Sequence, residues 1–403
     1  LPGWVSRASA HQRRGRAGRV QPGKCWHIFP RRQLEKLDDY QSPEIVRTPL
    51  EQLCLQVRAL KLARDGLGGI KDFVSKALTP PKEMSLINAL SKLKGIGALR
   101  SDSEDLTPLG AHLAMLPMEP AIGKALVYAT LFNCLEPVLT ITAILSYRSP
   151  FLMPLEHKDK ADRAKRRFAN GEPSDHKALL EAYNGWLDAC RRGESREFCW
   201  RNFLSEQTLR LVRDMREQYR GLLHTCGLIG SKDEERVKGV TSVADDWGVV
   251  KAVLVAGLYP NLIRIDPGKH RFKTSFITKS NGKVTPHPGS VNASHNIWEH
   301  RWMVYYDKQR TVGGIFVYDT TEISPLPIIL LGGVGGQPFL KFDSKGYAWG
   351  TQSNSEVEVV RHQDEPKHPD PTVQFVKDFI VNQGGSFGMA KLMGLLKRNF
   401  YEH

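Results

Sequence analysis

The sequence is that of a long and strongly basic chain. Its 403 residues hold 57 Lys and Arg against 43 Asp and Glu, which gives a formal net charge of +14 at pH 7. A chain of this length is expected to fold as several domains. It contains no apolar run of about 18 residues that would span a membrane. The excess of positive charge is typical of proteins that bind a polyanion such as RNA.

The cysteines argue against a disulfide-rich secreted domain. Six cysteines are scattered along the chain, and no two have the C-x-x-C spacing of zinc and redox sites. Most lie among apolar neighbours, so we expect buried, reduced thiols and no metal site. Such thiols favour an intracellular protein of the cytoplasm or nucleus, with the mitochondrion as the alternative.

The most informative segment is the arginine-rich stretch from Gln12 to Arg19, which holds four arginines and two glycines. A guanidinium matches phosphate oxygens with two parallel hydrogen bonds, and glycine lets a backbone approach a ligand closely. The apolar residues 24–29 that follow predict a buried strand. We therefore expect a phosphate-facing loop tied to a core strand. An RNA-binding tail, a nuclear-localisation patch or a solvated basic face is the alternative.

Residues 43–117 predict a small helical region that ends in a β-wing. Two prolines precede a helix in which Leu86, Leu90 and Leu93 share one face. The glycine-containing stretch at 95–107 then predicts the short strands of the wing.

Residues 118–250 are dominated by helical periodicity and predict a bundle. Helices are expected over residues 174–189 and 198–223, and a polar surface loop over residues 230–246. The basic run from Lys158 to Arg167 is interpreted as a solvated helix face.

From about residue 251 the pattern changes to short β-rich runs. Four such runs lie between Leu262 and Tyr318, and the Asn-Gly pair at 281–282 is a hairpin signal. Short strands at this spacing predict a barrel, and the OB-fold is the small barrel that binds oligonucleotides. The end of the chain predicts an amphipathic helix of unassigned role.

The short motifs of the chain, and their order along it, resemble those of the DEAH-box (DEAH/RHA) RNA helicases. The segment from Gln12 to Arg19 resembles motif VI. Further motifs resemble the winged-helix, helical-bundle and OB-fold domains of that family, and they begin at Pro43, Leu106, Leu116, Ser174, Cys199, Ala256 and His287. The resemblance runs over roughly residues 1–333. It is greatest to the subgroup with the G-quadruplex-resolving and dsRNA-associated helicases.

The resemblance implies a multidomain α+β chain in five parts. They are the end of a RecA-like α/β lobe, a winged helix, a ratchet-like helical bundle, an OB-fold β-barrel and a C-terminal extension, over residues 1–42, 43–117, 118–250, 251–344 and 345–403. The sequence has neither a Walker A motif nor an Asp-Glu-Ala-His motif. We therefore expect the C-terminal portion of a helicase, inactive by itself, whose motor lies upstream.

The resemblance also implies roles at a nucleotide. Arg16 and Arg19 would contact the γ-phosphate of ATP, and Gln12 would orient the attacking water or the γ-phosphate. Arginines in these positions neutralise charge on the transferred phosphoryl group. ATP and Mg²⁺ would be held mainly by the upstream lobes.

For RNA, the loops of the OB-like region supply the candidates. Single-strand binding combines basic groove residues with stacking aromatic rings. Because this region faces RNA in relatives, five residues are expected to contact RNA: Lys279, Lys283, His287, Ser290 and Asn292. The alternative for Ser290–Asn292 is that they only cap a strand.

The cluster Ser174-Asp175-His176 suggests catalysis at first sight. A helix N-cap followed by a buried packing histidine is the favoured interpretation, because serine is among the preferred N-cap residues.

The leading hypothesis is an ATP-dependent RNA helicase of the DEAH class that moves in the 3′-to-5′ direction. Its winged helix, bundle and OB-fold would form the floor and gate of the RNA channel. The alternative is a motorless RNA-binding or scaffold subunit of a ribonucleoprotein assembly. RNA is the expected partner in both cases, with a ribonucleoprotein complex or a protein cofactor as a further partner and no membrane.

Overall fold

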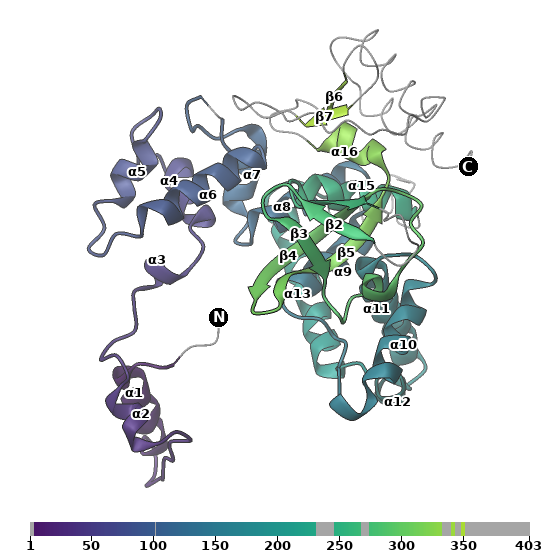
Figure 1. Cartoon of the computed structure of the whole chain (residues 1–403). Coiled ribbons are helices and arrows are strands. Elements are labelled where there is room, and N and C mark those ends of the chain that lie inside the picture. Colours follow the sequence, from purple (N-terminus) through teal and green to yellow (C-terminus); the bar gives the residue numbers. More distant parts are fainter. Residues whose placement is uncertain are drawn as a thin grey trace.

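The computed structural model describes residues 4–100, 102–230, 246–266, 274–332, 340–342 and 348–350. The surface loop expected after Gly230 and the amphipathic helix expected at the end of the chain lie outside these ranges. Figure 1 shows the described chain as an N-terminal helical pair, a small helical domain, and a larger body in which helices pack against a barrel.

The N-terminal segment holds two helices, α1 (Arg7–Ala17) and α2 (Arg31–Glu35). Arg7 joins them, because its guanidinium donates to the Leu34 and Glu35 carbonyl oxygens and to Asp39. The strand expected over residues 24–29 is absent from the described structure, where this segment is irregular and, apart from the half-buried Phe29, exposed. A strand needs a partner for its backbone groups, and no described strand pairs with it.

The small helical domain contains five helices, α3 (Glu44–Arg47), α4 (Glu51–Ala59), α5 (Gly69–Val74), α6 (Glu83–Gly95) and α7 (Pro108–Met115). As expected, Leu86, Leu90 and Leu93 turn one face of α6 into the core of this domain. The wing is reduced to a single bridge between Leu99 and Leu106.

The bundle follows, with helices α8 (Pro120–Leu131), α9 (Leu135–Ser146), α10 (Lys158–Ala169), α11 (Asp175–Arg191), α12 (Ser195–Arg201), α13 (Glu206–Thr225) and α15 (Trp247–Leu258), and the one-turn 3₁₀ helix η1 (Leu155–His157). Gly257 lets α15 approach α8 closely, since a Cβ there would lie 2.5 Å from the Ala125 Cβ. The single helix expected over residues 198–223 is two helices, α12 and α13, and Phe203 between them has a φ of +54°.

The barrel is closed, as the sequence predicted, in the order β1-β2-β3-β5-β4. Its strands are β1 (Leu262–Asp266), β2 (Ser275–Thr278), β3 (Gly282–Pro286), β4 (Trp302–Thr311) and β5 (Gly314–Ile323). Strands β3 and β5 pair in parallel and the other pairs are antiparallel. Gly282, with a φ of +64°, supplies the predicted turn between β2 and β3.

Two further elements complete the barrel region. The 3₁₀ helix η2 (Val291–Ser294) lies between β3 and β4, and helix α16 (Pro325–Leu331) follows β5. Strands β6 (Leu340–Phe342) and β7 (Ala348–Gly350) pair with each other in a separate two-stranded antiparallel sheet. The domain limits drawn from the sequence stay predictions.

Candidate nucleic-acid interface

The arginine-rich segment forms a helix rather than the expected loop. Residues 12–17 are the last turns of α1, which Ser6 caps by accepting a hydrogen bond from the Ser9 N–H at 3.1 Å. Alanine and arginine are both strong helix formers, which explains the difference. Gln12 and Arg16 are four residues apart and so lie on one helix face, and Arg19 follows just past the helix end.

All three side chains of this segment are exposed. Within the described ranges, neither Arg16 nor Arg19 forms an ion pair with a carboxylate, so both guanidinium groups remain available to an anion. The guanidinium of Arg14, by contrast, lies 2.7 Å from the His11 ring nitrogen. The donor chemistry of Arg16 and Arg19 therefore fits a phosphate group.

The turn between β2 and β3 carries the two lysines expected at RNA. Lys279 and Lys283 are exposed on either side of this turn. Lys308 reaches the same turn from β4, where its ammonium donates to Ser280 Oγ at 2.8 Å and to Asn281 Oδ1 at 2.6 Å. Sequence reasoning missed Lys308, although its spacing from Arg310 places both on one side of the strand. The barrel thus offers a cluster of cations at this edge.

His287 lies at the end of β3 and stacks on Tyr318 of β5, with ring centroids 4.5 Å apart and an interplanar angle of 24°. Its Nδ1 accepts a hydrogen bond from the Gly289 N–H at 3.1 Å. Burial and the nearby Lys165 charge lower the pKa of His287, which favours the neutral ring. A half-buried pair of stacked rings is a suitable surface for a base.

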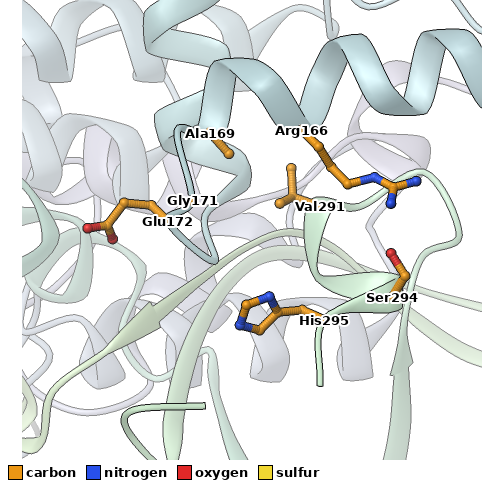
Figure 2. Close-up of a pocket in the computed structure, with 7 residues that line it drawn as sticks. All are labelled: Arg166, Ala169, Gly171, Glu172, Val291, Ser294 and His295. Carbon is orange, nitrogen blue, oxygen red and sulfur yellow. The ribbon is translucent and has the colours of Figure 1, made fainter. Parts of the chain in front are cut away.

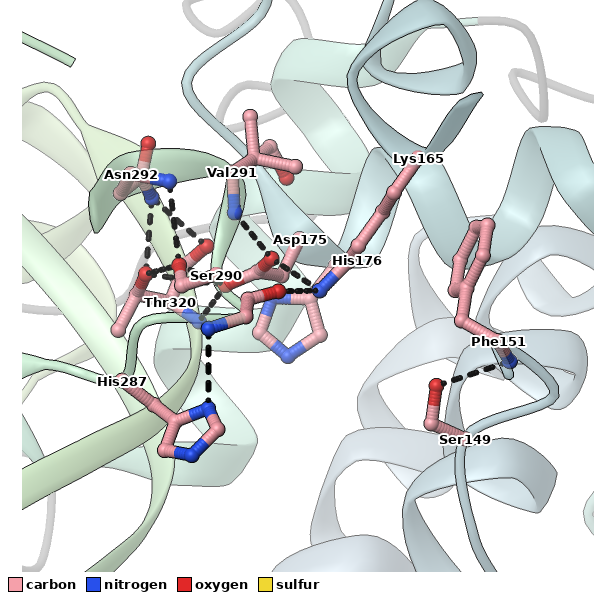
Figure 3. Close-up of polar contacts among 12 residues, drawn as sticks. Ser149, Phe151, Lys165, Asp175, His176, His287, Ser290, Val291, Asn292 and Thr320 are labelled. Atoms are coloured by element: carbon pink, nitrogen blue, oxygen red, sulfur yellow. Dashed lines mark hydrogen bonds and ion pairs between the residues drawn. The ribbon is translucent and has the colours of Figure 1, made fainter. Parts of the chain in front are cut away.

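Beyond His287, the loop is fixed from the helical bundle by one buried carboxylate (Figure 3). Asp175, at the start of α11, is 0% exposed. It accepts hydrogen bonds from Ser290 Oγ at 2.5 Å, from the Val291 N–H at 2.9 Å and from the Thr320 N–H at 3.0 Å. The Lys165 ammonium of α10 lies 2.8 Å from the same carboxylate. Asp175 therefore ties the bundle to two separate parts of the barrel.

The charges at this contact are matched. Burial opposes ionisation of Asp175, but the Lys165 charge and the hydrogen bonds it accepts hold its pKa below the ordinary value. Lys165 also donates to the Gly289 carbonyl oxygen at 2.8 Å. Lys165 thus departs from the expectation that the run Lys158–Arg167 is wholly solvated, because this one side chain turns inward to the buried carboxylate.

Ser174 and His176 flank Asp175 and have the structural roles that were expected. Ser174 caps α11 by accepting from the Lys177 N–H at 3.0 Å. Both Ser174 Oγ and His176 Nδ1 lie 2.6 Å from Thr321 Oγ1 in β5. Burial lowers the pKa of His176 to about 4, so the ring is neutral at pH 7. The cluster holds two domains together and is not a catalytic site.

Asn292 is buried, although it was expected to contact RNA. The residue is 1% exposed. Its side-chain amide donates to the carbonyl oxygens of Pro173 at 3.2 Å and Thr320 at 3.1 Å. A side chain buried in this way cannot reach RNA. Ser290, whose hydroxyl is held by Asp175, caps η2 rather than a strand. RNA contacts of the exposed Lys279 and Lys283 and the half-buried His287 stay predictions.

A second link joins three domains at Glu119, which directly precedes α8. Its carboxylate lies 3.1 Å from the Lys92 ammonium of α6 and accepts a hydrogen bond from the Tyr306 hydroxyl of β4 at 2.8 Å. Lys92 also pairs with Glu51 of α4 at 3.3 Å. The small helical domain, the bundle and the barrel therefore meet at one carboxylate.

Neither a metal centre nor a membrane helix is found in the described part of the chain. No three His, Cys, Asp or Glu side chains there are grouped so as to hold a metal ion. No described helix combines the length and the apolar character needed to cross a bilayer.

Comparison with protein families matches three successive parts of the chain. Residues 89–118 match the winged-helix part of the helicase-associated domain, and residues 119–179 match its ratchet-like part. Residues 250–334 match the oligonucleotide/oligosaccharide-binding OB-fold. These assignments agree with the small helical domain, the bundle and the closed barrel described above.

Individual relatives cover most of the chain. The Arabidopsis thaliana DExH-box ATP-dependent RNA helicase DExH1 is 47% identical over 334 residues, which are 83% of this chain and 32% of the relative. The human ATP-dependent DNA/RNA helicase DHX36 is 42% identical over 82% of this chain and 32% of the relative. The human ATP-dependent RNA helicase DHX29 is 39% identical over 82% of this chain and 24% of the relative.

The chain carries the winged-helix, ratchet and OB-fold domains of a DExH-box helicase. It spans about a third or less of the length of the curated relatives it matches. In this chain Asp175 is one of several residues that join the ratchet to the OB-fold, together with Ser174, His176 and Asn292. Sequence reasoning missed that role, because an acidic residue in the first turn of a helix is ordinary.

Proposed function

We propose that this chain is part of an ATP-dependent RNA helicase, in which its ratchet and OB-fold form a wall of the RNA path. The observation that carries the proposal is the OB-fold edge with Lys279, Lys283 and the stacked ring of His287. Single-strand binding combines such cations with such rings. The helicase relatives and the matched domains support it. Movement in the 3′-to-5′ direction is part of the proposal by family resemblance.

The same proposal gives two arginines of the N-terminal segment a role in ATP hydrolysis. Arg16 and Arg19 would neutralise charge on the γ-phosphate, while Gln12 would orient the attacking water or the γ-phosphate. Their exposure and their lack of carboxylate partners among the described residues support this role. ATP supplies the energy of the cycle, and Mg²⁺ would accompany its phosphates, held mainly outside this chain.

The test is the substitution Arg19→Ala in the intact helicase. If Arg19 acts on the γ-phosphate, ATP turnover should fall by about 10³-fold or more, while the affinity for single-stranded RNA should stay within about twofold. Arg14→Ala is the matched control, because Arg14 belongs to the same basic segment and its side chain lies at His11. Equal loss of turnover and RNA affinity in Arg19→Ala would assign this segment to RNA instead.

The alternative function is a motorless RNA-binding or scaffold subunit of a ribonucleoprotein assembly. The same OB-fold edge would serve it. It predicts RNA binding without RNA-stimulated ATP hydrolysis in the natural full-length protein, and that measurement separates the two proposals. A ribonucleoprotein complex or a protein cofactor is a further proposed partner.

A further inference from the structure

A small concavity lies where helix α10 of the ratchet meets η2 of the OB-fold (Figure 2). Its volume is about 170 Å³, and its walls come from both domains: Arg166, Ala169, Gly171, Glu172, Val291, Ser294 and His295. This is room for a phosphate group or a few water molecules. None of the residues assigned above to ATP or RNA lines it.

Three side chains at this concavity can donate hydrogen bonds to an anion. They are the Arg166 guanidinium, the Ser294 hydroxyl and the His295 imidazole. In the described structure Arg166 forms no ion pair, and its one hydrogen bond is a long contact of 3.4 Å from Nε to the Asp162 carbonyl oxygen. Its two terminal nitrogens therefore stay available for a ligand.

The single carboxylate of the lining does not compete for these donors. Glu172 is paired with Lys251 at 3.5 Å. In Figure 2 its carboxylate lies on the opposite side of the concavity from Arg166 and Ser294 and points away from them. The side of the concavity formed by Arg166, Ser294 and His295 is therefore free of negative charge from its own lining.

The two walls are tied to each other through one buried carboxylate, so the backbone that carries the donors is in place before a ligand arrives. On the OB-fold side, Val291 of η2 donates its N–H to the buried Asp175. On the ratchet side, Lys165, next to Arg166, contacts the same carboxylate. His295 is packed against Trp298, with ring centroids 4.8 Å apart. Pre-arranged donors lose little entropy on binding.

The surroundings of the concavity are strongly positive. Helix α10 exposes five cations, Lys158, Lys160, Arg163, Arg166 and Arg167. Within the described ranges none of them pairs with a carboxylate, whereas Lys165 of the same helix does. Such a helix face attracts a polyanion over a distance, and the concavity offers one of its phosphates a specific place.

We propose that this concavity binds a backbone phosphate of the RNA strand, with Arg166 as the charged ligand and Ser294 and His295 as supporting donors. This inference rests on the proposed function, because it assumes that the OB-fold edge holds RNA. It adds a ratchet-side contact in the middle of the β3–β4 connection, which begins at His287. The strand would then touch both domains of the Asp175 junction.

The test compares Arg166→Gln with Arg163→Gln in the 403-residue chain, by fluorescence anisotropy with an unstructured single-stranded RNA at several salt concentrations. Both substitutions remove one exposed charge from α10, but only Arg166 lines the concavity. Arg166→Gln should weaken binding several-fold and make the slope of log K against log salt shallower by about 0.7, the value for one phosphate on a single strand. Arg163→Gln should change neither clearly.

A second variant separates a defined site from general attraction. Ser294→Ala keeps every charge, so it should weaken RNA binding about two- to fivefold through one lost hydrogen bond, with an unchanged salt slope. Equal effects of Arg163→Gln and Arg166→Gln, or no effect of Arg166→Gln while the unsubstituted chain binds RNA, would overturn the site and leave the proposed function standing. If the unsubstituted chain does not bind RNA at all, both proposals fail together.

Discussion

Two carboxyl groups at the junction of the ratchet and the OB-fold have opposite titration behaviour. Asp175 is paired with Lys165 and has a lowered pKa. Asp319 in β5 has no such partner in the described structure, and burial together with the Asp175 charge raises its pKa to about 6. Asp319 also has a φ of +51°, in the left-handed region. Its ionised form is therefore a local source of instability at neutral pH.

We predict that Asp319→Asn stabilises the chain more at pH 8 than at pH 5. The pKa of Asp319 is higher in the folded state than in the unfolded state. The contribution of Asp319 to the free energy of unfolding is therefore fully present only below the unfolded pKa, and it is lost as pH rises through about 6. The gain at pH 8 should be on the order of 2 kcal/mol. Asparagine tolerates the positive φ.

Urea unfolding at the two pH values measures this gain. Asp102→Asn is the matched control, since Asp102 is an exposed carboxylate outside the barrel and is not among the groups that raise the pKa of Asp319. An equal gain for Asp319→Asn at both pH values would show that its carboxylate is not the cause.

At the scale of the element, helix α11 begins at the domain junction, and its N-cap serves two purposes. Ser174 caps the helix and also contacts Thr321 of β5. Ser205 caps α13 by accepting from the Thr208 N–H at 3.3 Å, and its hydroxyl bonds only within its own turn. The two serines therefore separate the capping effect from the interdomain effect.

We predict that Ser205→Ala costs about 1 kcal/mol, the usual value for a lost N-cap. Ser174→Ala should cost about 1 to 3 kcal/mol more, because it also leaves the buried Thr321 hydroxyl with one hydrogen-bond partner fewer. Thermal unfolding of both variants provides the comparison. Similar losses in the two variants would mean that the Thr321 contact adds nothing to stability.

At the scale of the whole molecule, some of the positive charges form structural ion pairs and others are exposed to solvent. Lys165 neutralises a buried carboxylate, and Lys92 links the winged helix to Glu119. By contrast, Lys279 and Lys283 are exposed at the β2–β3 turn, where Lys308 adds a third charge. A net charge of +14 thus leaves a cationic surface at the barrel edge after structural ion pairs are formed.

We predict that the double substitution of Lys279 and Lys283 by Gln weakens RNA binding of this chain and makes its salt slope shallower by about 1.4, since each single-strand phosphate contributes about 0.7. Lys76→Gln is the control, because Lys76 is an exposed lysine of the winged-helix region. Anisotropy titrations over a range of salt concentrations give both slopes. If Lys76→Gln weakens RNA binding by half as much as the double substitution does, the net charge of the chain alone would explain the effect.

The sequence by itself determined those features that depend on neighbouring residues. The apolar spacing of Leu86, Leu90 and Leu93 fixed one face of α6, and the Asn-Gly pair fixed the turn between β2 and β3. The serine before Asp175 marked the start of α11. These features are decided by local spacing, capping and turn geometry, which a sequence displays directly.

Only the tertiary structure decided which polar residues are buried and bonded inside the protein. Asp175 meets Ser290 across 115 positions of the sequence, and Asn292 meets Pro173 across 119, so no local pattern could reveal either contact. Likewise, the apolar residues 24–29 have the composition of a strand but no described strand beside them. A buried charge or a strand is stable only with its partner, and the fold determines whether a distant partner is in place.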